Sequence, residues 1–445
     1  MESIHALLTD ETIQSLLAAH PNNAALPDFV APSSWDWWDD PPDWHTLLDA
    51  TSSPLLASLR ANVLPRDPIA LDISIPQSAF GMSPKKHHEI TRMTQYIANL
   101  ASTRLPDVAK EHIHIIDVGA GQGYLTRALH EHFGSPTLAL DNNDAQTYGA
   151  LSRLGGSPSG ICHKTIHITS ATLVHAIDDW IPQPLTPDSP PIPVLLVALH
   201  ACGSLTPDVL RAVLTVPPSH RWVPVAVVAV GCCYNLMHPP HDFPLSPRLP
   251  TIPLPPSSYH LAAQMPAHWS DSAKTLRLAA LAIRKVVWRA LLGRIFAGIV
   301  HDRSLIATAP AKGTGSTPAM RKLGRLPDAA YDSWDTFLGC ASQRIGVDFL
   351  AARRERDAED TLLRARARLE NLHVRRCLLG PLIESYIVLD RVAWIREELA
   401  ALDVADSGEV TCPRYVVETV NLFDQATGSA RNIALVVGPP PPEKR

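Results

Sequence analysis

Residues 113–133 read IHIIDVGAGQGYLTRALHEHF, and this stretch decides the fold. Residues 113–118 have the apolar pattern of a buried β-strand. A glycine turn then leads into a helix that we expect to reach Phe133. A helix that begins at a glycine turn directs free backbone N–H groups and the positive end of its dipole outward. The stretch therefore predicts a strand–turn–helix unit with a ligand site at the turn.

Further strands and helices follow this unit along the chain. Most of the expected strands are continuous Val, Ile and Leu runs, which is typical of a parallel sheet covered on both faces. The sequence predicts an α/β fold with a mostly parallel seven-stranded sheet. Beyond the first strand, its strands are expected at 137–143, 164–170, 193–200 and 223–231 and in RYVVETVNLF and RNIALVV near the C-terminus, with helices over 205–216 and in LLGPLIESYIVLDRVAWIREELAAL.

Composition divides the chain into segments. Residues 271–400 hold 22 Lys and Arg against 15 Asp and Glu, whereas the whole chain has a net charge of −5. Acidic residues interleave with these arginines, a pattern that favours exposed helices with ion pairs over a nucleic-acid surface. We expect four segments: an N-terminal helical cap (1–80), the first part of an α/β core (81–256), a basic helical insertion (257–376) and the last helix and closing strands (377–445).

The overall composition narrows the class of protein. Of the 445 residues, 46% are hydrophobic and 19% charged, as in an ordinary globular protein. Seven cysteines without a paired framework indicate a reducing compartment. The start MESIHALLTD lacks a basic leader, and five basic residues interrupt the most apolar stretch, 276–300. These features predict a cytoplasmic or nuclear protein that has no membrane partner.

The glycine turn contains Gly119, Gly121 and Gly123, an acid-preceded G-x-G-x-G. A dinucleotide fingerprint requires its third glycine at position 124, which is Tyr124, and no Lys-Ser or Lys-Thr follows to make a phosphate-binding P-loop. About twenty residues beyond the turn, Asp141 ends the second expected strand, in position to accept hydrogen bonds from a ribose diol. The pattern indicates a nucleoside-containing ligand.

This combination resembles the class I methyltransferases, whose cofactor is S-adenosylmethionine. The resemblance implies that Asp117 lies near the methionyl amine of the cofactor and that the three glycines form its cradle. It also implies that Asp141 holds the ribose hydroxyls.

Two unusual motifs follow the fourth and fifth expected strands, LHACGSL and GCCYNLM. Because parallel strands end at the same edge of a sheet, both motifs should open onto the crevice beside the glycine turn. We expect His200 to accept the proton of a methyl acceptor and Tyr234 to stack on the acceptor or to face the sulfonium. Cys202 should lie beside them, so these three residues are the predicted catalytic set.

Together with SPKKHHE, RRCLLGPLIESYIVLDRVAWIRE and VNLFDQATGSARNIALV, these motifs resemble the methyltransferase-like protein 25 family, which includes relatives labelled ribosomal RNA adenine dimethylase domain-containing. The resemblance implies a class I sheet and a macromolecular acceptor, RNA or protein. It also favours a role for Lys85, and for Lys86 next to it, in meeting the cofactor carboxylate or a phosphate of the acceptor; both lysines precede the first strand. Amine-directed methyltransferases carry Asn/Asp-Pro-Pro-aromatic or Asn-Leu-Pro-aromatic after the fourth strand; His-Ala-Cys-Gly stands here, so base methylation lacks its own motif.

Two alternatives stay open. His200 and the cysteines 202, 232 and 233 are suitable zinc ligands. No C-x-x-C pair is present, however, and adjacent Cys232 and Cys233 would point to opposite sides of an extended chain unless it bends after Gly231. We therefore expect no metal. The other alternative is a catalytically silent protein that binds the cofactor and serves as a scaffold, and the sequence leaves the oligomeric state undetermined.

Overall fold

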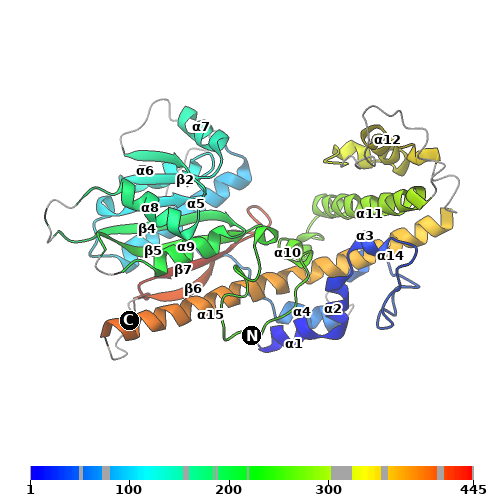
Figure 1. Cartoon of the computed structure of the whole chain (residues 1–445), viewed down its shortest axis with the longest axis horizontal. Helices are drawn as coiled ribbons and strands as arrows, with labels where there is room; N and C mark the ends of the chain where they lie inside the picture. The colour runs from blue at the N-terminus through cyan, green and yellow to red at the C-terminus, as the bar shows by residue number, and fades with distance from the viewer. Residues whose placement is uncertain are drawn as a thin grey trace. The chain divides into compact units, whose positions relative to one another are not determined.

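The computed structural model describes residues 2–49, 54–72, 81–153, 160–183, 186, 189–217, 220–301, 323–351, 359–407 and 415–442. The chain forms two compact units, and each brings together segments that are distant in the sequence (Figure 1). The first unit comprises Leu64–Pro253 and Ile383–Arg445, and the second comprises Glu2–Val63 and Leu254–Leu382.

The first unit is built on a seven-stranded sheet with the order β3-β2-β1-β4-β5-β7-β6. Its strands are β1 (His114–Val118), β2 (Thr137–Asp141), β3 (Ile161–Thr165), β4 (Ile192–Cys202), β5 (Trp222–Cys232), β6 (Val416–Asn421) and β7 (Ile433–Gly438). This is the Rossmann-like α/β fold of class I methyltransferases, as the sequence predicted.

The sheet is mixed, not wholly parallel. Strands β1 to β5 pair in parallel, whereas β7 runs antiparallel to both β5 and β6. No helix crosses over between β6 and β7, so the chain turns back and β7 pairs beside β6 in the opposite direction. The antiparallel pairing is confined to the end of the sheet away from the glycine turn.

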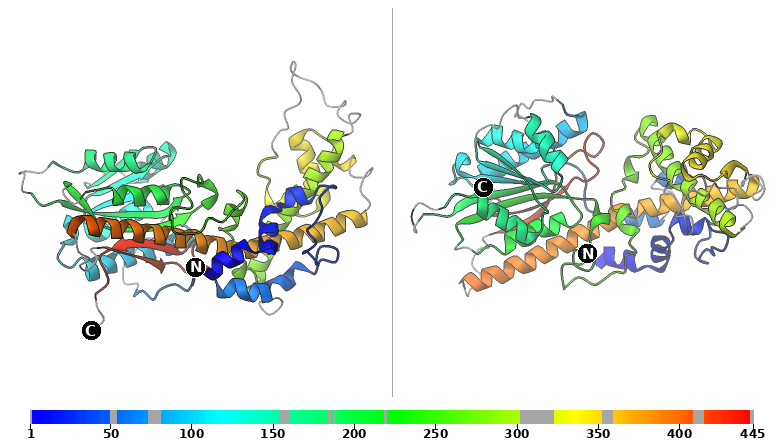
Figure 2. Two further views of the ribbon diagram at one scale, coloured as in Figure 1. Left: turned by 60° about the horizontal axis from the view of Figure 1, so that its bottom comes forward. Right: turned by 45° about the horizontal axis from the view of Figure 1, so that its top comes forward.

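Helices cover both faces of this sheet (Figure 2). Successive strand residues alternate between the faces: Ile115 packs in one hydrophobic core and Ile116 in the other. The helices α5 and α6 contribute to the first core, and α8, α9 and α15 to the second. The helices of this unit are α5 (Pro84–Arg104), α6 (Tyr124–Phe133), α7 (Asp144–Arg153), α8 (Ser170–Trp180) and α9 (Leu205–Leu214), with most of α15 (Gly380–Ser407).

The third strand was predicted too late in the sequence. It was expected over 164–170 but spans Ile161–Thr165. Thr169 cannot extend the strand because it is the N-cap of α8, where its hydroxyl accepts a hydrogen bond from the backbone of Thr172 at 3.3 Å. Residues 166–169 form a loop at the strand's carboxyl end, and three of them line a cavity described below.

The second unit is helical. Arg376 is buried in it and donates hydrogen bonds to the carbonyl oxygens of Leu16 and Leu17 at 2.6 and 2.7 Å. The N-terminal residues and the basic segment therefore pack together in one unit. The sequence analysis expected them as two separate segments, a cap and an insertion. The elements are α1 (Glu2–Thr9), α2 (Glu11–Ala18), α3 (Pro21–Ala24), η1 (Trp44–Leu48), α4 (Pro54–Ala61), α10 (Ser258–Leu261), η5 (Pro266–His268), α11 (Ala273–His301), η7 (Asp328–Tyr331), α12 (Trp334–Ile345) and α14 (Glu359–Leu378).

Basic side chains of α11 make contacts inside the second unit. Lys285 Nζ lies 2.7 Å from a carboxylate oxygen of Asp328, and Arg289 Nε donates to the Tyr331 hydroxyl at 3.0 Å. In α14, Arg366 Nε lies 2.7 Å from Glu370, an ion pair of the kind expected among the interleaved charges, whereas residues 352–358 lie outside the described part of the chain. Across the described parts of the chain, no helix, α11 included, is long and apolar enough to cross a bilayer.

Candidate active site

The glycine turn lies between β1 and α6. Gly119, Gly121 and Gly123 all have positive φ angles, of 76°, 54° and 69°, which a side chain would strain. A Cβ atom on Gly119 would also lie 3.1 Å from a methyl group of Leu205. Gly121 N donates to one carboxylate oxygen of Asp141 at 2.8 Å, so the acid at the end of β2 fixes the turn.

Two cavities adjoin this turn. The first, here called the glycine cavity, has a volume of about 360 Å³, and its lining includes Lys86, Asp117, Gly119, Gly121, Asp141 and His200. The second, the strand-end cavity, has a volume of about 690 Å³, and its lining includes His167, His200, Cys202, Asp208, His238 and His241. Both cavities are lined by Gly119, Asp141, Asn142 and His200, so they share a wall.

Asp117 lies at the base of the glycine cavity. Its side chain is almost fully buried, and it accepts a hydrogen bond from the Thr126 hydroxyl at 2.6 Å. Burial disfavours the ionised form and raises the pKa of Asp117 to about 6, although the Thr126 hydroxyl opposes this shift. The carboxyl group can therefore change its charge near neutral pH.

The structure places Lys86, not Lys85, in the lining of the glycine cavity. The Lys86 ammonium lies 5.5 Å from the centre of the Tyr124 ring. Lys85 is half exposed, and its ammonium lies 3.9 Å from Glu89, one helical turn further along α5. Adjacent residues on a helix are about 100° apart, which is why only one of the two lysines faces the cavity. The predicted role of Lys85 is thus better suited to Lys86.

Glu89 is a residue that the sequence suggests only as a partner that orients the lysines of α5, and the structure also brings it to His200. It is 1% exposed, and one carboxylate oxygen lies 3.2 Å from Nε2 of His200, which is 111 residues away in the chain. The sequence feature that could have identified Glu89 is its position directly before the apolar residues of α5. Burial alone would lower the pKa of His200, but the neighbouring Cys232 thiol and Glu89 carboxylate raise it to about 9.

His200 lies where the sequence analysis expected it, at the end of β4 and in the shared wall of the cavities. Its Nε2 lies 3.2 Å from the Glu89 carboxylate, which orients the ring. The role of His200 as the acceptor of a proton from the methyl acceptor stays a prediction.

Tyr234 lies away from both cavities. It is 1% exposed, and its hydroxyl donates to Glu384 at 3.0 Å, while the guanidinium of Arg391 lies 5.3 Å from the ring centre. Burial raises the pKa of Tyr234 well above its usual value. These contacts occupy both the ring and the hydroxyl, so the structure gives Tyr234 a packing role instead of a place facing the acceptor or the sulfonium.

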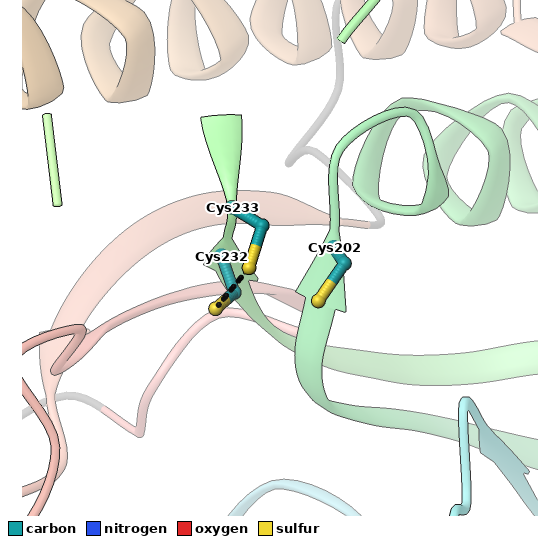
Figure 3. Close-up of side chains that lie close together, drawn as sticks. All are labelled: Cys202, Cys232 and Cys233. Carbon is teal, nitrogen blue, oxygen red and sulfur yellow. Dashed lines mark hydrogen bonds between the residues drawn. The ribbon is translucent and has the colours of Figure 1, made fainter. Parts of the chain in front are cut away.

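Three cysteines converge at the ends of β4 and β5 (Figure 3). Cys202 and Cys232 are register partners on the two parallel strands. Cys233 has the left-handed angles φ 45° and ψ 53°, which end the side-to-side alternation of the strand. Its sulfur therefore lies 3.5 Å from that of Cys232. The sequence analysis allowed this approach only if the chain bends after Gly231, and the chain does bend, at Cys233.

Residues 85–240 match the family model of a methyltransferase domain. The match spans β1 to β5, the glycine turn and the cysteine cluster. The first unit therefore contains a segment that is similar to methyltransferase domains, and it has the seven-stranded sheet of the class I fold.

Solved methyltransferase structures are similar at a low level. TrmN from Thermus thermophilus has 14% identity and a TM-score of 0.21, with 33% of this chain and 41% of that chain covered. A SAM-dependent methyltransferase from Aquifex aeolicus has 15% identity and a TM-score of 0.18, with coverage of 34% and 73%. Geranyl diphosphate C-methyltransferase from Streptomyces coelicolor A3(2), solved with S-adenosyl-L-homocysteine, has 13% identity and a TM-score of 0.18, with coverage of 40% and 65%.

The chain spans about half the length of several of the solved structures that it matches. Scores this low carry no argument about substrate or partner. The acceptor is therefore a matter for the proposal that follows.

Proposed function

We propose that the protein transfers the methyl group of S-adenosylmethionine to a macromolecular acceptor, RNA or protein. The observation that supports this best is the shared wall of the two cavities. One cavity adjoins the glycine turn and suits the donor, and the larger one beside it suits an acceptor group. Methyl transfer requires a nucleophile in line with the sulfonium, so holding the two reactants in adjoining cavities supplies much of the catalysis.

The donor would lie in the glycine cavity. A carboxylate offers about four lone-pair sites, and Asp141 uses two of them for Gly121 N and Asn143 N, so two remain for the ribose hydroxyls. Asp117 in its ionised form would attract the methionyl amine, and Lys86 would attract the methionyl carboxylate. The positive φ angles of the three glycines allow the backbone to approach the ligand closely.

The acceptor group would enter the strand-end cavity. Its 690 Å³ can admit a nucleobase or an amino-acid side chain together with part of its backbone. The motifs around this cavity, LHACGSL and GCCYNLM, are those that resemble the methyltransferase-like protein 25 family. We infer membership in that family from these motifs, and with it a macromolecular acceptor.

Two measurements test the proposal. Calorimetric titration should show binding of S-adenosylmethionine and S-adenosylhomocysteine near the micromolar range, about −8 kcal/mol. Incubation with labelled methyl donor and fractionated macromolecules should then transfer label, and ribonuclease or protease treatment of the product identifies the acceptor class. Donor binding without transfer to any fraction would favour the silent scaffold. A well-folded protein that binds neither ligand would overturn the proposal.

A further inference from the structure

The three cysteine sulfurs at the ends of β4 and β5 all lie within 4.8 Å of one another. Thiolates that share one tetrahedral zinc ion, with Zn–S distances of about 2.3 Å, are about 3.8 Å apart. The Cys232 and Cys233 sulfurs are already 3.5 Å apart. A small movement of Cys202, whose side chain is half-buried, would complete a three-thiolate set.

His200 is a neighbour of Cys232, but its ring nitrogens do not lie within 4.8 Å of all three sulfurs, so the ring would have to turn toward the cluster to supply a fourth donor. Its Nε2 is engaged with Glu89 at 3.2 Å, whereas its Nδ1 is buried and has no hydrogen-bond partner in the described parts of the chain. A zinc-binding histidine typically donates its other ring N–H to a carboxylate, which fixes the tautomer and the ring orientation. Glu89 and His200 show that arrangement, and Nδ1 is the nitrogen left for a metal ion, which would displace the proton that Nδ1 carries.

We propose that Cys202, Cys232, Cys233 and His200 bind a zinc ion, with Nδ1 of His200 as the fourth ligand and Glu89 as a positioning residue. Three thiolates and an imidazole are soft donors that select zinc over magnesium or calcium. Four protein ligands make a closed site, which is typical of structural zinc. The proposal does not depend on methyl transfer, because the metal content and the zinc affinity of the protein test it without any activity measurement.

The backbone conformation around the cluster indicates that the ion would stabilise the ends of β4 and β5. His200 and Cys233 are the non-glycine residues with positive φ among those described, at 64° and 45°. Residues other than glycine keep such conformations only where their surroundings hold them. One ion bound to both strand ends would hold these two bends and, through His200, the wall between the glycine and strand-end cavities.

Metal analysis of the full chain, purified in a phosphine reductant without chelator, is the first test. We expect about one zinc per chain in the wild type and less than a tenth of that in Cys232→Ser. Cys162→Ser is the matched control, since Cys162 is a half-buried cysteine of β3 outside the cluster, and it should keep its zinc. Equal zinc in both variants would overturn the proposal.

Zinc titration of the metal-free wild type against a chromophoric chelator removes any dependence on how variants fold. We expect one zinc per chain to compete with the chelator, and to bind more weakly as the pH falls because thiol protons must leave. Glu89→Gln should weaken zinc binding by about 10- to 100-fold, as loss of a supporting carboxylate does. No zinc uptake by folded, fully reduced wild-type protein would overturn the proposal, as would unchanged affinity in Glu89→Gln.

Discussion

The carboxylate of Glu89 lies 3.2 Å from Nε2 of His200, which links helix α5 to the end of strand β4. Glu89 is buried and belongs to the helix that also carries Lys86 into the glycine cavity. This contact therefore positions residues on both the donor side and the acceptor side of the proposed site. A change in either residue is therefore expected to affect the wall between the two cavities.

Replacement of Asp141 by alanine should weaken S-adenosylmethionine binding at least tenfold. The substitution removes the proposed partner of the ribose hydroxyls and also the acceptor of the Gly121 N–H. Isothermal titration calorimetry measures the effect. Asp144→Ala is the control, because Asp144 is exposed at the start of α7 and lines neither cavity; it should bind as the wild type does. Equal affinities of all three proteins would refute the ribose assignment.

Replacement of Asp117 by asparagine should stabilise the donor-free protein at pH 8. The pKa of this carboxyl is about 6 in the folded chain and 3.8 ordinarily, so its favourable contribution is complete below the unfolded value and is lost as the pH rises through 6. At pH 8 the buried charge costs up to about 3 kcal/mol, which the amide avoids.

Urea unfolding of wild type and Asp117→Asn at pH 5 and pH 8 checks this expectation. The advantage of the variant should grow with pH, and a difference independent of pH would argue against a buried, titrating Asp117. The same variant should bind S-adenosylmethionine more weakly at pH 8, because it lacks the charge that attracts the methionyl amine. A variant that is more stable but binds the donor more weakly would show that the charge of Asp117 lowers the stability of the free protein and contributes to donor binding.

The two adjacent lysines of α5 should differ in their effect on donor binding. Lys86→Ala should weaken binding of S-adenosylmethionine about 3- to 10-fold, since an ion pair with the carboxylate in a partly buried cavity contributes about 1 kcal/mol. Lys85→Ala should change it less than twofold, because Lys85 is half exposed and directed toward Glu89. Calorimetry at low and high salt compares them; the reverse order would restore the assignment made from sequence.

Replacement of Tyr234 by phenylalanine should reduce stability and leave donor binding unchanged. The variant loses the hydroxyl that donates to buried Glu384 at 3.0 Å, at a cost of about 1 to 3 kcal/mol in the free energy of unfolding. Urea unfolding and donor titration measure the two effects separately. A tenfold loss of donor affinity with unchanged stability would contradict the packing role and support the expectation that Tyr234 faces the cofactor.

The positions of most strands along the chain and of the glycine turn were predictable from local patterns. The run of Ile115, Ile116 and Val118 and the glycines after it specify a buried strand and a tight turn by their composition alone. Asp141 followed from its distance along the chain. The sequence could not show which of Lys85 and Lys86 lines the cavity, because the side of a helix that faces the site depends on how the helix is rotated when it packs against the sheet.

The sequence by itself therefore determined most of the strands, the glycine turn and the acid that closes it, because these depend on residues close together in the chain. It also indicated that LHACGSL and GCCYNLM lie at one edge of the sheet, but only the tertiary structure decided which of their side chains meet. Glu89 meets His200, and Cys202 meets Cys232 and Cys233, only because β4 and β5 pair in register and α5 packs against their face. The left-handed bend at Cys233 is set by the same packing, since side-chain direction at a strand end follows the backbone angles, which local composition does not specify.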